Sequence, residues 1–162
     1  MEPLIRFATK NDAPAILLLI QGLADFEKAS DQVVITVEDL ERDGFGTDPK
    51  FWCYVAEVHL EQKVEIVGMA LFYPRYSTWK GPTIHLEDLM VQKEFRGQCI
   101  GTALYRSVLS YAKARGVKRV NWEVLDWNTP AVAFYEKSGA NVLKEWRVVS
   151  MDGHALSAYL ES

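Results

Sequence analysis

The chain has 162 residues, of which 49% are hydrophobic and 25% are charged. A chain of this size is typical of one domain, here residues 1–162, which buries roughly 70% of the surface that its unfolded form exposes. The 18 basic and 22 acidic residues give a net charge of −4, which disfavours nucleic acid as the main partner and favours a small cationic one.

The composition also argues against membrane and metal functions. The longest aliphatic run, Ala15 to Ile20, is far shorter than the ~18 apolar residues of a membrane span. The start Met1-Glu2-Pro3 is unlike a signal peptide, so we expect a cytoplasmic protein with no membrane contact. Two cysteines, Cys53 and Cys99, with three scattered histidines predict no disulfide framework and no metal site.

The chain opens with a short strand and a helix. Ile5-Arg6-Phe7 is apolar enough for a first strand, and a helix is predicted from about Asp12. Asp12 is a candidate cap and Pro14 falls in the first turn, and both are typical of a helix start. The buried face of this helix is predicted to carry Ile16, Ile20 and Leu23.

A second helix and two strands follow. The sequence Thr36-Val37-Glu38-Asp39 indicates a capping box for a short helix that ends before Gly44. Residues 52–58 and 64–73 are rich in β-branched and aromatic side chains. They predict two strands joined by the polar turn Glu61-Gln62-Lys63.

The next strand changes phase in its middle. Ile84 and Leu86 share one parity, whereas Leu89 and Val91 have the opposite parity, so the slip falls at Glu87-Asp88. A slip of one residue in a period-two pattern is what a β-bulge produces. A strand buried on both faces, where parity carries little information, explains the pattern equally well.

The last part of the sequence predicts a helix, a strand, a second helix and a β-hairpin. Apolar residues from Ile100 to Ala112 repeat at helical spacing, and Gly116 is a stop signal. A strand is predicted over 119–125, and Asn128-Thr129-Pro130 opens a helix that carries Tyr135 and stops at Gly139. Residues 142–149 and 154–160 flank Asp152-Gly153, a pair favoured in tight hairpins. The predicted order is βααβββαβαββ.

One segment indicates a phosphate-bearing ligand. From Leu86 to Thr102, an apolar strand meets two acids, a basic glycine-containing turn and a helix start. The first backbone N–H groups of a helix have no acceptor within it, so a turn with Arg96, Gly97 and Gly101 can direct several donors and a cation at one pyrophosphate.

This order and these segments resemble the GCN5-related N-acetyltransferase (GNAT) family over essentially the whole chain. The chain is most similar to the diamine acetyltransferase branch, and within it to the spermidine/spermine type 2, or thialysine, acetyltransferases. Five blocks in the same order carry this resemblance: F-E-K at 26–28, S-D-Q-V at 30–33, D-G-F-G at 43–46, Y-S-T-W-K-G at 76–81 and V-L-D-W-N at 124–128. The resemblance implies an α/β (α+β) GNAT fold with a mixed, mostly antiparallel sheet, a bulged fourth strand and about four flanking helices.

One position departs from the family pattern. The pyrophosphate turn of the family has the pattern R/Q-x-x-G-x-G/A, and Cys99 stands at its central glycine. A side chain at a position that needs positive φ costs ~1–3 kcal/mol of strain. We expect coenzyme binding all the same, because a small thiol fits if φ stays negative and Arg96 is retained.

The resemblance also implies catalytic roles. Glu87 matches the general base, although the residues alone also fit an exposed strand acid paired with a basic neighbour. Tyr135 matches the general acid that protonates the leaving thiolate, and its alternative is a core aromatic. Asp88 matches a substrate-ammonium anchor or a structural hydrogen-bond acceptor. Asn128 is a helix cap, a coenzyme contact, or both.

The implied function is acetyl transfer from acetyl-CoA to a small cationic amine, a thialysine-like amino acid or a diamine or polyamine, by direct attack in a ternary complex and without a metal. Acetyl-CoA is expected to contact Leu89, Met90, Val91, Arg96, Gly97, Gln98, Cys99, Ile100, Gly101, Thr102, Asn128, Ala131 and Tyr135. The amine is expected to contact Phe26, Glu27, Ser77, Trp79, Glu87 and Asp88.

Two positions refine these expectations and two other functions stay open. Spermidine-preferring relatives usually carry an acid where this chain has Ser77, which favours shorter amines or lysine analogues. Trp79 fits a subunit contact equally well, and the family implies a homodimer.

The alternative functions are the same fold acting on a protein terminus or an antibiotic amine, and a non-enzymatic acyl-CoA-binding module.

Overall fold

The structure, a computed structural model, describes residues 2–61 and 63–161. Contacts divide the chain into two compact units, residues 1–123 and 124–162, which are described separately. The expectation of one domain over 1–162 stays a prediction. The predicted turn at 61–63 includes Gln62, which lies outside the described residues.

The first unit is built on a five-stranded sheet in the order β1-β2-β3-β4-β5. The first three pairs are antiparallel and β4 with β5 is parallel, which confirms a mixed, mostly antiparallel sheet. The strands are β1 Leu4–Phe7, β2 Trp52–Leu60, β3 Lys63–Ser77, β4 Gly81–Val91 and β5 Val120–Asn121.

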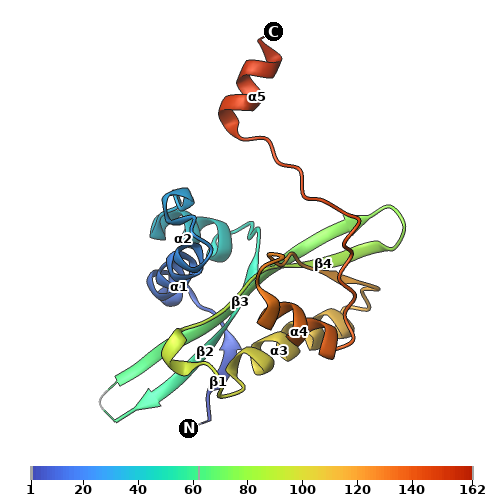
Figure 1. The fold of residues 1–162 in the computed structure, drawn as a ribbon. Coiled ribbons are helices and arrows are strands. Elements are labelled where there is room, and N and C mark those ends of the chain that lie inside the picture. The colour runs from blue at the N-terminus through green and yellow to red at the C-terminus, as the bar shows by residue number, and fades with distance from the viewer. Residues whose placement is uncertain (1, 62, 162) are drawn as a thin grey trace. The chain divides into compact units, whose positions relative to one another are not determined.

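Helices cover both faces of this sheet. α1 (Ala13–Phe26) and α2 (Val37–Phe45) lie on one face and α3 (Ile100–Ala114) lies on the other (Figure 1). Short 3-10 helices η1 (Lys10–Asp12), η2 (Ser30–Gln32) and η3 (Lys93–Phe95) connect the elements. With α4 and α5 of the second unit, the described residues form five α-helices, where about four helices were expected.

The two faces have different cores. On the α1 face, Ile16 and Leu19 pack with Met69 and Leu71 of β3, and Ile20 and Leu23 lie partly buried against them. On the α3 face, the Phe72 ring lies 5.0 Å from the ring of Tyr111. The sequence prediction of Ile16 as a core residue of the first helix is confirmed.

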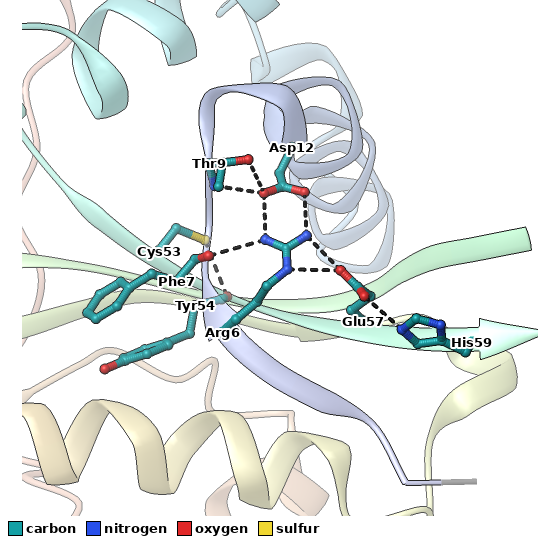
Figure 2. Close-up of polar contacts among 8 residues, drawn as sticks. All are labelled: Arg6, Phe7, Thr9, Asp12, Cys53, Tyr54, Glu57 and His59. Carbon is teal, nitrogen blue, oxygen red and sulfur yellow. Dashed lines mark hydrogen bonds and ion pairs between the residues drawn. The ribbon is translucent and has the colours of Figure 1, made fainter.

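A cluster of ion pairs fixes the N-terminal end of the sheet (Figure 2). Arg6 donates to both oxygens of the buried Asp12 carboxylate, at 2.8 and 2.9 Å, and to Glu57 at 2.9 Å. Asp12 also accepts from the backbone N–H and hydroxyl of Thr9. Arg6 lowers the pKa of Asp12 through these hydrogen bonds. Because the residues come from β1, η1 and β2, the cluster joins the first strand to the start of α1.

The second helix is capped as predicted but is longer. Thr36 Oγ1 accepts from the Asp39 N–H, and the Asp39 carboxylate accepts from the Thr36 N–H, which completes the capping box. The helix continues through Gly44 to Phe45, so the prediction that it ends before Gly44 is wrong. A Cβ on Gly44 would lie 2.4 Å from the Phe51 ring, so this glycine makes room for an aromatic neighbour rather than ending the helix.

The fourth strand contains the predicted bulge. Phe72 lies opposite Leu86 and Leu71 lies opposite Asp88, so Glu87 is the extra residue of β4. Residues 83–86 are also buried in succession, as expected of a strand covered on both faces. Both explanations of the phase change therefore hold for this strand.

The fifth strand is shorter than predicted. The sequence predicts a strand over 119–125, but among the described residues only Val120 and Asn121 form strand pairs, with Ile84 and His85. The bulge at Glu87 interrupts the regular β4 backbone two residues beyond His85, so Trp122 and Glu123 meet no regular strand edge.

The second unit corrects the prediction of a terminal hairpin. It contains α4 (Thr129–Lys137) and α5 (Gly153–Leu160), while residues 140–152 form neither helix nor strand. Asp152 accepts a hydrogen bond from the Ala155 N–H at 2.8 Å, with the extended backbone of an N-cap. A two-residue turn of type I′ needs positive φ at both residues, and neither Asp152 nor Gly153 has it. The Asp-Gly pair therefore starts a helix.

Candidate functional site

The bulge turns two neighbouring acids to the same face of the sheet. Asp88 lies opposite Leu71, whose side chain belongs to the core under α1. Glu87 is hydrogen-bonded to Tyr73, which packs against that same core. Adjacent residues of a regular strand point to opposite faces, so the extra residue is what brings both carboxylates to the α1 side.

Glu87 is held by aromatic neighbours. The Tyr73 hydroxyl donates to Glu87 Oε2 at 2.6 Å, and His85 Nε2 lies 3.5 Å from the same oxygen. The Glu87 side chain is 50% exposed, so it reaches solvent while it keeps these contacts. Burial, followed by the hydrogen bond to Glu87, raises the pKa of Tyr73 to about 12. Tyr73 therefore stays protonated and donates near neutral pH.

Asp88 lies in an acidic environment. Burial, followed by the charges of Glu87 and Glu27, raises the pKa of Asp88 to about 6. Burial also raises the pKa of Glu27, which follows the last residue of α1. Two further carboxyl groups therefore act on the charge of Asp88, and an ammonium group would offset their effect.

The basic turn after β4 folds back on the strand. Arg96 Nε donates to the Val91 carbonyl at 2.9 Å, and its guanidinium carbon lies 5.6 Å from the centre of the Phe26 ring. Phe26 is the last residue of α1, so the helix end, the acidic bulge and the turn converge within the first unit. An open depression of about 430 Å³ adjoins the turn, lined by Glu2, Pro3, Gln98, Cys99 and Ala103.

Cys99 has a strained backbone. It precedes the first residue of α3, Ile100, with φ of 61°, while Gly97 has φ of 77°. The expectation that a thiol is accommodated at negative φ is therefore wrong. The turn keeps the left-handed geometry that the family glycine permits, so Cys99 costs about 1–3 kcal/mol there. The amides of Ile100, Gly101 and Thr102 open α3 and, by helix geometry, have no acceptor within it.

Beyond the bulge, one edge of β4 is open. β4 pairs with β3 along its length, but on its other side β5 reaches only Ile84 and His85 among the described residues. The segment Leu89-Met90-Val91 thus has an edge that no described strand covers, and it leads directly into η3 and the turn. Such an edge presents backbone donors and acceptors to an extended ligand.

Ser77 and Trp79 lie away from the acids, at the turn between β3 and β4. Ser77 Oγ accepts from the backbone N–H groups of Trp79 and Lys80 at 3.2 Å, and the Trp79 side chain is 77% exposed. Four strand residues, roughly 13 Å, separate Ser77 from Tyr73. The structure therefore does not bring these two predicted substrate residues together with Glu87 and Asp88.

The remaining predicted residues belong to the second unit. Asn128 caps α4 by accepting from the Ala131 N–H at 3.4 Å, which agrees with its predicted capping role. Tyr135 is buried on α4, with its ring 5.3 Å from that of Phe134. The proposed base and acid thus come from different units of the chain.

Sequence reasoning missed Tyr73 and His85. They lie directly opposite each other on β3 and β4, with ring centres 5.2 Å apart. The register between the two strands would have identified them, because counting back from the bulge puts both on the face of Glu87. Among the described residues, no group of three or more metal-binding side chains is placed to hold an ion, and no helix has the length and apolar character to cross a bilayer.

Residues 21–140 match the family described as the acetyltransferase (GNAT) family. The chain belongs to this family. It is 42% identical over 161 residues to a thialysine N-epsilon-acetyltransferase of Bos taurus, with 94% of each chain covered. It is 34% identical over 157 residues to the thialysine N-epsilon-acetyltransferase of Caenorhabditis elegans, again with 94% of each chain covered.

A solved structure has the same fold. An integron cassette protein from the mobile metagenome of V. cholerae, VCH_CASS6, superposes with a TM-score of 0.78 at 20% identity, covering 100% of this chain and 99% of that one. The GNAT fold predicted from the sequence is thereby confirmed. With the family match and the curated relatives, the chain is an N-acetyltransferase, as the sequence predicted.

Proposed function

We propose that this N-acetyltransferase transfers the acetyl group of acetyl-CoA to a primary amine of a small cationic substrate, a thialysine-like amino acid or a diamine or polyamine. The observation that carries the proposal is the bulge of β4, which brings Glu87 and Asp88 to one face. The charge of Glu27 acts on Asp88 there. An ammonium group relieves the mutual repulsion of these acids, and the names of the relatives in two species support the substrate class.

The coenzyme would bind along β4 and the turn. The open edge at Leu89-Met90-Val91 suits the extended pantetheine arm, and the amides of residues 97–102 with Arg96 suit the pyrophosphate. Positive φ at Gly97 and Cys99 favours this, because it directs successive N–H groups to one side. The coenzyme supplies the acetyl thioester, and the protein supplies orientation and proton transfer.

The amine must lose a proton before it attacks. With a pKa near ~10.4, about one primary amine in a thousand is neutral at pH 7.4, a penalty of roughly 4 kcal/mol. Glu87 is our candidate base, because its carboxylate is half exposed and fixed by Tyr73. Asp88 and Glu27 are our candidates for anchoring the second charge of the substrate, since a nearby carboxylate stabilises the charged amine and opposes deprotonation.

The transfer itself would be direct. The amine nitrogen forms a bond to the thioester carbonyl carbon, the carbon–sulfur bond breaks, the amine proton passes to Glu87 and the thiolate receives a proton. Tyr135 is our candidate for the last step, since a phenol of pKa ~10 can protonate a thiolate. Holding both reactants together contributes up to ~7–11 kcal/mol.

The acceptor preference and the cellular setting are part of the same proposal. Ser77 is a neutral residue at the tip of the β3–β4 hairpin, roughly 13 Å of strand from Tyr73, so it offers no charge to the far end of a long polyamine. We therefore place thialysine-like amino acids and short diamines ahead of spermine. A cytoplasmic homodimer is the assembly that the family resemblance suggests.

An acceptor panel tests this function. Purified protein is incubated with acetyl-CoA and thialysine, lysine, a short diamine, spermidine, an aminoglycoside or a peptide, and free CoA thiol is measured. We expect thiol release that depends on the acceptor and is fastest with thialysine or a short diamine. No acceptor-dependent release would overturn the proposal. Stoichiometric acetyl-protein formed from acetyl-CoA alone would overturn direct attack.

A further inference from the structure

Tyr73, His85 and Glu87 form a cluster at the bulge of β4. Tyr73 of β3 lies opposite His85 of β4, and this pair precedes the bulge at Glu87 by two residues. The rings are stacked, with centres 5.2 Å apart and planes inclined by 29°. The His85 side chain is buried, with 9% of its surface exposed, so it gives the Tyr73 ring a fixed surface to stack on.

The contacts of Glu87 involve one of its two oxygens. Among the described residues, both Tyr73 Oη, at 2.6 Å, and His85 Nε2, at 3.5 Å, contact Oε2. Arg75 lies on the far side of the imidazole, with Nη1 3.4 Å from Nδ1. The carboxylate is therefore fixed through Oε2, while Oε1 remains for a ligand or a water molecule.

We propose that Tyr73 is a positioning residue, which holds Glu87 through Oε2 so that Oε1 faces the amine and receives its proton, and that His85 keeps the phenol in place by stacking on it. This inference rests on the proposed function and deepens it. A half-exposed glutamate on a strand can adopt several rotamers, and most of them do not direct its carboxylate at the amine. A short hydrogen bond from a stacked phenol selects one of them.

Charged groups from several elements lie around this pair. Arg75 on β3 and Glu123 after β5 act on Tyr73, and His85 lies beside Glu87. The charges of Glu87 and of Glu27 after α1 act on Asp88.

The test is Tyr73→Phe, which removes the hydroxyl and keeps the ring that stacks on His85. With the best acceptor of the panel, we expect kcat to fall about tenfold while the amine KM changes less than threefold. The matched control is Tyr54→Phe, because Tyr54 stacks on Phe72 on the α3 face. We expect this control to keep the wild-type kcat and KM. In the Glu87→Gln background, Tyr73→Phe should cause little further loss.

Other outcomes separate the inference from the function. If the wild type turns over but Tyr73→Phe keeps the wild-type kcat, the positioning role is wrong and the function stands. The same holds if the loss caused by Tyr73→Phe adds fully to the loss caused by Glu87→Gln. If Tyr73→Phe only lowers the melting temperature, as a merely structural hydroxyl would, the role is also wrong. Absence of turnover in the wild type contradicts the proposed function instead.

Discussion

The two ends of the segment from Leu86 to Thr102 are built in opposite ways. At the acidic bulge, side chains fix the geometry: Tyr73 and His85 contact Glu87, and Asp88 lies opposite Leu71 over the α1 core. At the basic turn, residues 96–99 are exposed, and two of them, Gly97 and Cys99, have left-handed backbones.

This difference matches the two tasks proposed for the segment, proton transfer at the bulge and coenzyme binding at the turn. A group that moves protons must be oriented before the substrate arrives, so neighbouring side chains hold it in place while it stays accessible. A turn that binds a polyanion must keep backbone donors available, and the anion itself then stabilises the conformation. The comparison predicts that changes at the bulge alter turnover and changes at the turn alter coenzyme affinity.

The largest expected effect follows from Glu87→Gln. The amide keeps the size of the side chain and can still accept from Tyr73, but it cannot take a proton. We expect kcat/KM for the amine to fall about 10²–10⁴-fold at pH 7, with the loss shrinking as the pH rises towards the pKa of the amine. Steady-state kinetics across pH measure this, and an unchanged pH profile would remove Glu87 from the role of base.

A variant that changes stability at a site away from the bulge and the turn provides a reference for these effects. Asp12→Asn weakens the ion-pair cluster with Arg6 and should lower the free energy of unfolding by ~2–3 kcal/mol at pH 7. Since Arg6 lowers the pKa of folded Asp12, this stabilisation is fully present above the unfolded value of ~3.9 and is lost as the pH falls through the folded pKa. Urea titrations at several pH values measure the difference from wild type.

That reference variant should keep the wild-type kcat below its unfolding temperature. The cluster joins β1, η1 and β2 (Figure 2), and the contacts recorded for Glu87 are with Tyr73 and His85 instead. A fall in kcat as large as that of Glu87→Gln would mean that loss of stability alone explains both variants.

A smaller effect is expected at the turn. Cys99→Gly removes a side chain from a left-handed residue and should raise the free energy of unfolding by ~1 kcal/mol. It should also tighten acetyl-CoA binding severalfold, because the backbone can approach the pyrophosphate more closely, while kcat stays within about twofold. Cys99→Ala is the matched control, since it keeps Cβ and loses only the thiol. An equal gain with alanine would assign the effect to sulfur.

Local patterns predicted much of this fold and missed what depends on pairing. The parity change at Glu87-Asp88 located the bulge, because burial alternates residue by residue along a strand. Tyr73 was missed, since its role depends on the register between β3 and β4, which no single segment contains. Asp152-Gly153 was misinterpreted because the same two residues suit a hairpin turn and a helix N-cap, and the hydrogen bond to Ala155 decides between them.

The candidate site was predicted in the same uneven way. The pairing of Asp88 with the charge of Glu27 joins residues 61 positions apart in sequence, and only the resemblance to the family suggested it. The sequence identified Cys99 as the residue at the family's central glycine, but the prediction that its φ is negative was wrong. Side-chain size alone does not determine the backbone conformation of a turn. The hairpin tip with Ser77 and Trp79 lies farther from the acids than their grouping implied.

The most direct test of this division of work is a calorimetric titration of acetyl-CoA into the wild type and into Glu87→Gln. The account predicts one saturable coenzyme site per chain and the same Kd for both proteins, within about twofold, although the variant turns over at least a hundredfold more slowly. No measurable coenzyme binding by the wild type, or a variant that loses affinity and turnover together, would contradict it.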